Sequence, residues 1–90
     1  IPYNAFIEYL KYEKRYSVHT IRAYRDDLEL FFQYLTASFG ETSLKEISAS
    51  FIRSWLAYQK EKGDSAKTIN RRISSLKSFF KHAMKTGSIG

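Results

Sequence analysis

The amino-acid sequence predicts an all-α domain, a compact bundle of four main helices that form two packed helical hairpins. Apolar residues recur at three- and four-residue steps almost throughout, and one Pro and four Gly leave few breaks in this pattern. Such spacing is typical of amphipathic helices. No stretch shows the period-two alternation that a half-buried strand would need. A repeat within the chain is the second observation that favours this fold.

Two segments match each other at an offset of 48 positions. Both copies share a Ser, a Thr, an Ile, a Leu and two Phe at identical spacing: Ser17, Thr20, Ile21, Leu28, Phe31 and Phe32, then Ser65, Thr68, Ile69, Leu76, Phe79 and Phe80. We interpret each copy as a long helix with an apolar stripe, preceded by a shorter helix and a tight turn. Two such hairpins can bury their stripes only against each other.

The first hairpin is expected to begin with a helix at about residues 4–14, which carries Phe6, Ile7 and Leu10 on one face. A turn at residues 15–17 leads to a second helix at about residues 18–37, and Gly40 is expected to end it. Tyr24 lies on the apolar stripe of this helix, so we interpret it as a packing residue. We place the neighbouring acidic residues on the solvated side, balanced by Arg22 and Arg25: Asp26, Asp27 and Glu29.

The second hairpin follows a possible single helical turn at residues 43–47, where Ser43 and Glu46 have capping-box spacing. Ser48 is expected to cap a third helix and Gly63 to end it. The inward residues of this helix are Phe51, Ile52, Trp55 and Leu56. The fourth helix is expected at about residues 66–85, followed by Gly87, and its inward residues are Ile69, Ile73, Leu76, Phe80, Ala83 and Met84.

The net positive charge of the chain comes from the second copy of the repeat. Residues 65–90 hold six of the fifteen Lys and Arg and none of the nine Asp and Glu, whereas residues 1–64 hold nine of each, so the net charge of +6 comes from the second copy. A basic surface of this kind favours a polyanionic partner, with nucleic acid first.

Composition also limits the other function classes. The chain has no Cys, which excludes disulfides and thiolate zinc sites and fits a reducing, cytoplasmic compartment. No apolar run is long enough to span a membrane. His19 and His82 have no ligand-spaced partners, so we expect no metal or other cofactor and no catalytic site. We interpret residues 1–90 as one domain taken from a longer protein.

The fourth helix carries the clearest candidate binding surface. Its polar side combines cations with small hydroxyl and amide side chains and has no carboxylate: Lys67, Asn70, Arg71, Ser74, Ser78, Lys81 and Lys85, with Thr68, Arg72 and Ser75 on the flank. Long cations can reach phosphates or guanine edges, an Asn suits adenine, and serines allow close approach. This pattern favours a helix that faces DNA or RNA over a merely solvated one.

The two helix starts add a second candidate surface. Ser17 and Ser65 are good N-caps. Thr20 and Thr68 stand where a capping box would have Glu or Gln, and their hydroxyl groups can either complete the cap or donate to a phosphate at the helix N-terminus. The residues alone leave both readings open. On the second helix, His19 and Arg22 would extend such an anion-facing surface.

These motifs together resemble a known family. Ser17-x-x-Thr20-x-x-x-Tyr24-x-x-x-Leu28, followed by Ser65-x-x-Thr68-Ile69 and Leu76-x-x-Phe79-Phe80, is similar to the N-terminal core-binding domain of tyrosine recombinases of the Xer and phage-integrase type, which is SAM-like. The opening Phe6-Ile7-Glu8-Tyr9-Leu10 and the Leu44-Lys45-Glu46-Ile47 stretch fit as well.

The resemblance implies one half of a clamp around a recombination-site duplex, with the second and fourth helices at the major groove. By matching position the DNA contacts are His19, Thr20, Arg22 and Ala23, then Lys67, Thr68, Arg71 and Ser75; the exposed-face chemistry adds Asn70 and Ser74. The family's catalytic Arg, Lys, His and Tyr belong to a separate C-terminal domain. The implied partners are double-stranded DNA, that catalytic domain and other recombinase protomers.

Two other functions remain open at this stage. A transcription regulator could use the same helices to contact DNA bases, and SAM-like folds also serve as protein-interaction modules. DNA binding would weaken steeply with salt, whereas a flat response would favour a protein partner.

Overall fold

The computed structural model describes residues 3–40, 42 and 46–87, and this part of the chain contains four helices and no strand. The helices are α1 (Asn4–Tyr12), α2 (Val18–Phe39), α3 (Ala49–Lys62) and α4 (Ala66–Lys85). The all-α prediction is therefore confirmed, as is the division into two helical hairpins. Of the predicted turn at 43–47, only residues 46 and 47 lie within the described residues.

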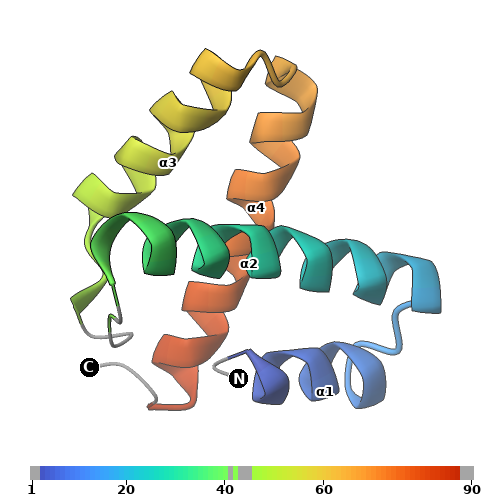
Figure 1. Cartoon of the computed structure of the whole chain (residues 1–90). Coiled ribbons are helices and arrows are strands. Elements are labelled where there is room, and N and C mark those ends of the chain that lie inside the picture. The colour runs from blue at the N-terminus through green and yellow to red at the C-terminus, as the bar shows by residue number, and fades with distance from the viewer. Residues whose placement is uncertain (1–2, 41, 43–45, 88–90) are drawn as a thin grey trace.

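The two long helices form the centre of the bundle. Figure 1 shows α1 beneath α2 and running in the opposite direction, while α4 passes behind α2 and crosses it instead of lying alongside. α3 starts near the C-terminal end of α2 and leads up to the start of α4. α2 and α4 each contact all three other helices, whereas α1 and α3 do not pack on one another.

The helix ends follow local sequence signals. Gly63 ends α3 in the left-handed region (φ 89°), where its N–H reaches the carbonyl groups of Gln59 and Lys60. Gly40 ends α2 as predicted, and its N–H donates to the Thr36 carbonyl at 3.1 Å, although the last helical residue is Phe39, two residues beyond the expected bound. α1 ends two residues earlier than expected.

The core lies where the two copies of the repeat face each other. Leu28 and Leu76 are fully buried at equivalent repeat positions, as are Phe31 and Phe79. The remaining core residues come from all four helices and the residue before α1: Tyr3, Phe6, Leu10, Leu35, Trp55, Ile69 and Ala83. The apolar stripes therefore pack against each other as the repeat predicted.

The prediction for the inward face of α4 is wrong at its C-terminal end. Met84 is 62% exposed, while Phe79, which was not among the expected inward residues, is 2% exposed. Phe80 is only half-buried. Because α4 crosses α2, the contact face is centred on Leu76 and Phe79 and leaves the side of the helix that carries Met84 uncovered. No helix in the described part of the chain is long and apolar enough to cross a membrane.

Candidate nucleic-acid interface

α2 and α4 meet at one pair of equivalent repeat positions. Asp27 on α2 and Ser75 on α4 are 48 residues apart, and the Ser75 hydroxyl donates to Asp27 Oδ2 at 2.8 Å. Both side chains are buried. A pair of buried polar groups that satisfy each other contributes stability, whereas either group alone would be costly. The crossing is therefore fixed by a hydrogen bond as well as by apolar packing.

Arg71 completes this buried polar contact from the groove side. Its Nη2 donates to the second carboxylate oxygen, Asp27 Oδ1, at 2.7 Å, while the Arg71 side chain stays 57% exposed. Asp27 itself is 1% exposed. Our interpretation of Asp27 as a solvated residue balanced by Arg22 and Arg25 is therefore wrong. The helical spacing of α2 places Asp27 beside Leu28, on the edge of the stripe that α4 covers.

A groove opens beside the crossing, between the N-terminal halves of α2 and α4. Its volume is about 390 Å³. In Figure 1 the two helices diverge from the crossing toward their N-termini. The lining residues are His19, Thr20, Ala23, Tyr24, Asp27, Arg71, Ser74 and Ser75. Six of the ten residues predicted to contact DNA thus come together in one concavity.

The other predicted residues lie outside the lining of this groove. Arg22, Lys67 and Asn70 are exposed, and Thr68 is half-buried. Ser75 differs from the rest of the predicted set, because its buried hydroxyl is already used by Asp27. It therefore supports the groove from beneath rather than presenting a donor at its surface. Ala23 is half-buried and offers a small apolar patch.

The two helix N-termini have the same hydroxyl arrangement. Ser17 Oγ accepts from the Thr20 N–H at 3.2 Å and donates to Thr20 Oγ1 at 3.1 Å. In α4 the same two bonds join Ser65 and Thr68, at 3.2 and 3.0 Å. The predicted N-caps Ser17 and Ser65 are confirmed. Each Thr hydroxyl accepts from its Ser, and no described residue accepts its own hydrogen, which can donate to a group outside the chain.

The third helix differs at this position. Ser48 is the N-cap residue of α3, as predicted, but its side chain makes no hydrogen bond to the helix backbone. Its hydroxyl instead pairs with the Ser50 hydroxyl at 2.8 Å. Among the described helices the Ser-Thr arrangement is therefore found at the starts of α2 and α4, and Thr20 of α2 lines the groove.

Charge around the groove is divided between free and compensated cations. Arg22 and Lys67 form no ion pair with any residue that the structure describes, whereas Arg71 is paired with Asp27. Arg72 turns away from the groove, and its Nη1 donates to Gln59 Oε1 at 2.9 Å and to Asp64 Oδ2 at 2.8 Å. Two of the six cations of the second copy are thus neutralised by carboxylates elsewhere in the chain.

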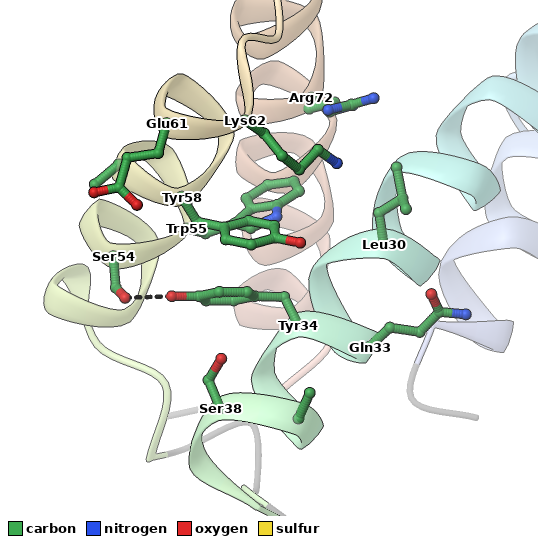
Figure 2. A pocket seen from close by; sticks show the side chains of 12 residues that line it. Leu30, Gln33, Tyr34, Ser38, Ser54, Trp55, Tyr58, Glu61, Lys62 and Arg72 are labelled. Atoms are coloured by element: carbon green, nitrogen blue, oxygen red, sulfur yellow. Dashed lines mark hydrogen bonds between the residues drawn. The ribbon is translucent and has the colours of Figure 1, made fainter.

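A larger cavity of about 600 Å³ lies on the other side of α4, between the C-terminal half of α2 and α3. Figure 2 shows the Tyr34 ring facing the Tyr58 ring, with centroids 5.0 Å apart, and the hydrogen bond between the Tyr34 and Ser54 hydroxyl groups. None of the ten predicted contact residues lines it. No sequence pattern predicted this cavity, because its walls combine ordinary packing and surface residues of α2 and α3 with Arg72 of α4.

The described residues contain no group of three or more His, Cys, Asp or Glu that could hold a metal ion. The groove beside the crossing is lined by the N-terminal turn of α2 and by hydrogen-bond donors of α4, and the exposed cations Arg22 and Lys67 lie outside its lining on the same two helices. Such a set of groups suits a polyanion.

Comparison with known proteins identifies related sequences. Residues 3–87 match the family model described as the phage integrase N-terminal SAM-like domain. The chain is 37% identical over 82 residues to the tyrosine recombinase XerC of Anoxybacillus flavithermus, covering 91% of this chain and 27% of that protein. It is 40% identical over 80 residues to XerC of Bacillus subtilis, covering 89% and 26%.

A second type of recombinase is also similar. The tyrosine recombinase XerD of Listeria monocytogenes is 34% identical over 84 residues, which cover 93% of this chain and 28% of that protein. The chain thus spans about a quarter of the length of the curated relatives it matches. No solved structure matches it.

Proposed function

Because the chain belongs to the family of phage integrase N-terminal SAM-like domains, we propose that it binds double-stranded DNA as the N-terminal clamp domain of a site-specific tyrosine recombinase. The observation that carries this proposal is the groove between α2 and α4, where six residues expected to contact DNA converge. The similarity to recombinases favours this function over a transcription regulator or a protein-interaction module.

The dimensions of the crossing support the proposal. Thr20 lies seven residues before Asp27, and Thr68 lies seven residues before Ser75. Each threonine is therefore about 10 Å along its helix from the crossing. The major groove of DNA is about 12 Å wide. Each helix N-terminus thus lies within one major-groove width of the crossing, and we propose that both contact phosphates of a major groove whose floor faces Arg71 and Ser74.

The chemistry of the contacts follows from the groups present. Each helix N-terminus has free backbone N–H groups and the positive end of the helix dipole, and both favour a phosphate. The free hydroxyl hydrogens of Thr20 and Thr68 add one donor each. Arg22 and Lys67 neutralise phosphates on the two sides, and Asn70, Ser74 and Arg71 are proposed to face base edges.

Strand cleavage is proposed to reside outside these 90 residues, in the part of the longer protein that the relatives contain. The best-placed tyrosine at the groove, Tyr24, packs edge-to-face on Phe6 with ring centroids 5.8 Å apart and stacks on Tyr16 at 6.1 Å. We therefore assign it a structural role. A catalytic domain and other recombinase protomers are the proposed protein partners.

The proposal is tested by removing one free cation from each helix. In the double variant Arg22→Gln/Lys67→Gln, the plot of log K against log salt for a mixed-sequence duplex should become shallower by roughly 1.8, since each phosphate contact contributes about 0.9. Fluorescence anisotropy at several salt concentrations measures the slope. Both side chains are exposed, so helicity and melting temperature should stay unchanged.

A matched control removes two exposed cations from other faces. The variant Lys11→Gln/Arg53→Gln changes the net charge equally but affects α1 and α3. It should keep the wild-type slope to within a few tenths. Equal slopes for the two double variants would refute the assignment of this face, and a wild-type affinity that does not depend on salt would refute DNA binding itself.

A further inference from the structure

We propose that Asp27 is a positioning residue that holds the Arg71 guanidinium as a fixed, charge-compensated donor to guanine edges, so that Arg71 discriminates between sequences while Arg22 and Lys67 supply affinity. This inference rests on the proposed DNA-binding function. It assigns a role to a buried carboxylate on α2 that sequence patterns place among solvated residues.

The carboxylate is immobile. Asp27 is 1% exposed, and its two oxygens accept from two different α4 side chains, Oδ2 from Ser75 at 2.8 Å and Oδ1 from Arg71 at 2.7 Å. The Ser75 hydroxyl is itself buried. A carboxylate fixed in this way determines where its partner guanidinium lies, because a charge-assisted hydrogen bond of this length has strict geometry.

The geometry leaves Arg71 able to read a base. A guanidinium has two edges that can form paired hydrogen bonds, and each uses one of the two N–H groups of Nη2. Asp27 accepts one of these, so one complete edge remains. The side chain is 57% exposed and lines the groove beside Ser74, whose small side chain allows a base pair to approach. A paired arginine edge matches O6 and N7 of guanine.

Arg71 and Lys67 lie on the same face of α4 but differ in whether a carboxylate compensates their charge. Lys67 lies one turn earlier on α4 and forms no ion pair with a described residue. Its charge is free to release counterions from DNA. The charge of Arg71 is offset by Asp27 at 2.7 Å, so Arg71 adds little to this electrostatic term. Because its side chain is already ordered, little conformational entropy is lost when it binds a base.

The experiment compares two duplexes with identical charge. One has alternating G·C pairs, and the other has the same sequence with 7-deazaguanine, which lacks the N7 acceptor. The wild-type chain should bind the first duplex about fivefold more tightly or better, since a paired contact contributes 1–3 kcal/mol of discrimination. The double variant Asp27→Asn/Arg71→Gln has the wild-type net charge and should bind both duplexes equally, with an unchanged salt slope.

Three comparison variants isolate the mechanism. Lys67→Gln should keep the preference for guanine but give a slope shallower by about 0.9. The charge-neutral variant Arg25→Gln/Asp26→Asn changes the same pair of residue types on the exposed side of α2, and it should behave as the wild type. Arg71→Lys keeps the positive charge that compensates the buried Asp27 but loses the planar fork, so it should lose the preference without changing the slope. Thermal unfolding followed by circular dichroism checks that this variant keeps the fold.

The outcomes separate the two proposals. A wild-type chain that binds both duplexes equally, with a steep salt slope, would overturn the role of Asp27 and Arg71 while leaving DNA binding intact. The same holds if Arg71→Lys retains the preference, or if Asp27→Asn/Arg71→Gln retains it with a shallower slope. A wild-type chain that binds neither duplex would overturn the proposed function.

Discussion

The paired hydroxyl groups at the start of α4 allow the cap and the proposed phosphate contact to be tested separately. Ser65 accepts from the Thr68 N–H at 3.2 Å, and it donates to the Thr68 hydroxyl at 3.0 Å. Ser65→Ala removes both bonds and leaves a backbone donor without its cap. Thr68→Val is isosteric, removes only the threonine hydroxyl, and leaves the bond from its backbone N–H in place.

The two variants should therefore act on different quantities. Loss of a Ser N-cap costs typically about 1 kcal/mol. For a domain of this size that corresponds to a fall in melting temperature of roughly 4–8 °C. Thr68→Val should change stability by no more than about 0.5 kcal/mol, because the lost bond is exposed. It should weaken DNA binding about tenfold, the effect of roughly 1.5 kcal/mol for a hydrogen bond to a charged group.

Thermal unfolding followed by circular dichroism measures the first effect, and fluorescence anisotropy with a mixed-sequence duplex measures the second. Ser48→Ala is the matched control, since Ser48 occupies an N-cap position without a cap hydrogen bond and should have little effect on either quantity. If Thr68→Val lowers the melting temperature as much as Ser65→Ala and leaves DNA affinity unchanged, the hydroxyl pair is purely structural and the reasoning fails.

Two further predictions concern the core. Phe79→Ala should cost about 3–5 kcal/mol in urea unfolding, whereas Met84→Ala should change stability by less than about 0.5 kcal/mol, and similar losses for the two would contradict the observed packing of α4. Gln59→Leu should cost about 1–3 kcal/mol because Arg72 Nη1 keeps only one of its two acceptors, Asp64. Gln59→Leu with Arg72→Met should recover part of that loss, since it removes the unpaired donor but also the ion pair with Asp64. A double variant no more stable than Gln59→Leu alone would show that the hydrogen bond is not the cause.

The helices could be predicted because their ends depend on neighbouring residues. Ser17 and Ser65 cap α2 and α4, and Gly40 and Gly63 end α2 and α3, each through bonds within four residues along the chain. The repeat predicted that the two hairpins would pack together. The caps and stops are local signals, and the repeat is a signal shared by two segments. Both can be recognised in a single sequence, because apolar residues spaced at 3.6 residues per turn show where each helix lies.

The angle and position of the crossing between α2 and α4 could not be predicted from the sequence. Phe79 and Phe80 are adjacent and equally apolar, so spacing alone does not tell which of them faces α2. The buried carboxylate could not be recognised either, because Asp27 stands in a run of exposed acidic residues. Asp27 is buried because Arg71 and Ser75, which are more than forty residues away in the sequence, contact it in the folded structure. The ten candidate contacts remain predictions, although six of them now line one groove.

The crossing also explains why the two copies differ in charge. Asp27 in the first copy corresponds to Ser75 in the second, and Arg71 in the second corresponds to Ala23 in the first. A carboxylate in both copies at positions 27 and 75 would place two buried negative charges against each other, which is strongly unfavourable in an apolar environment. An arginine in both copies would make two cations compete for one acceptor. One carboxylate from the first copy therefore compensates one cation from the second, and the remaining cations of α4 that have no ion-pair partner among the described residues are Lys67, Lys77, Lys81 and Lys85.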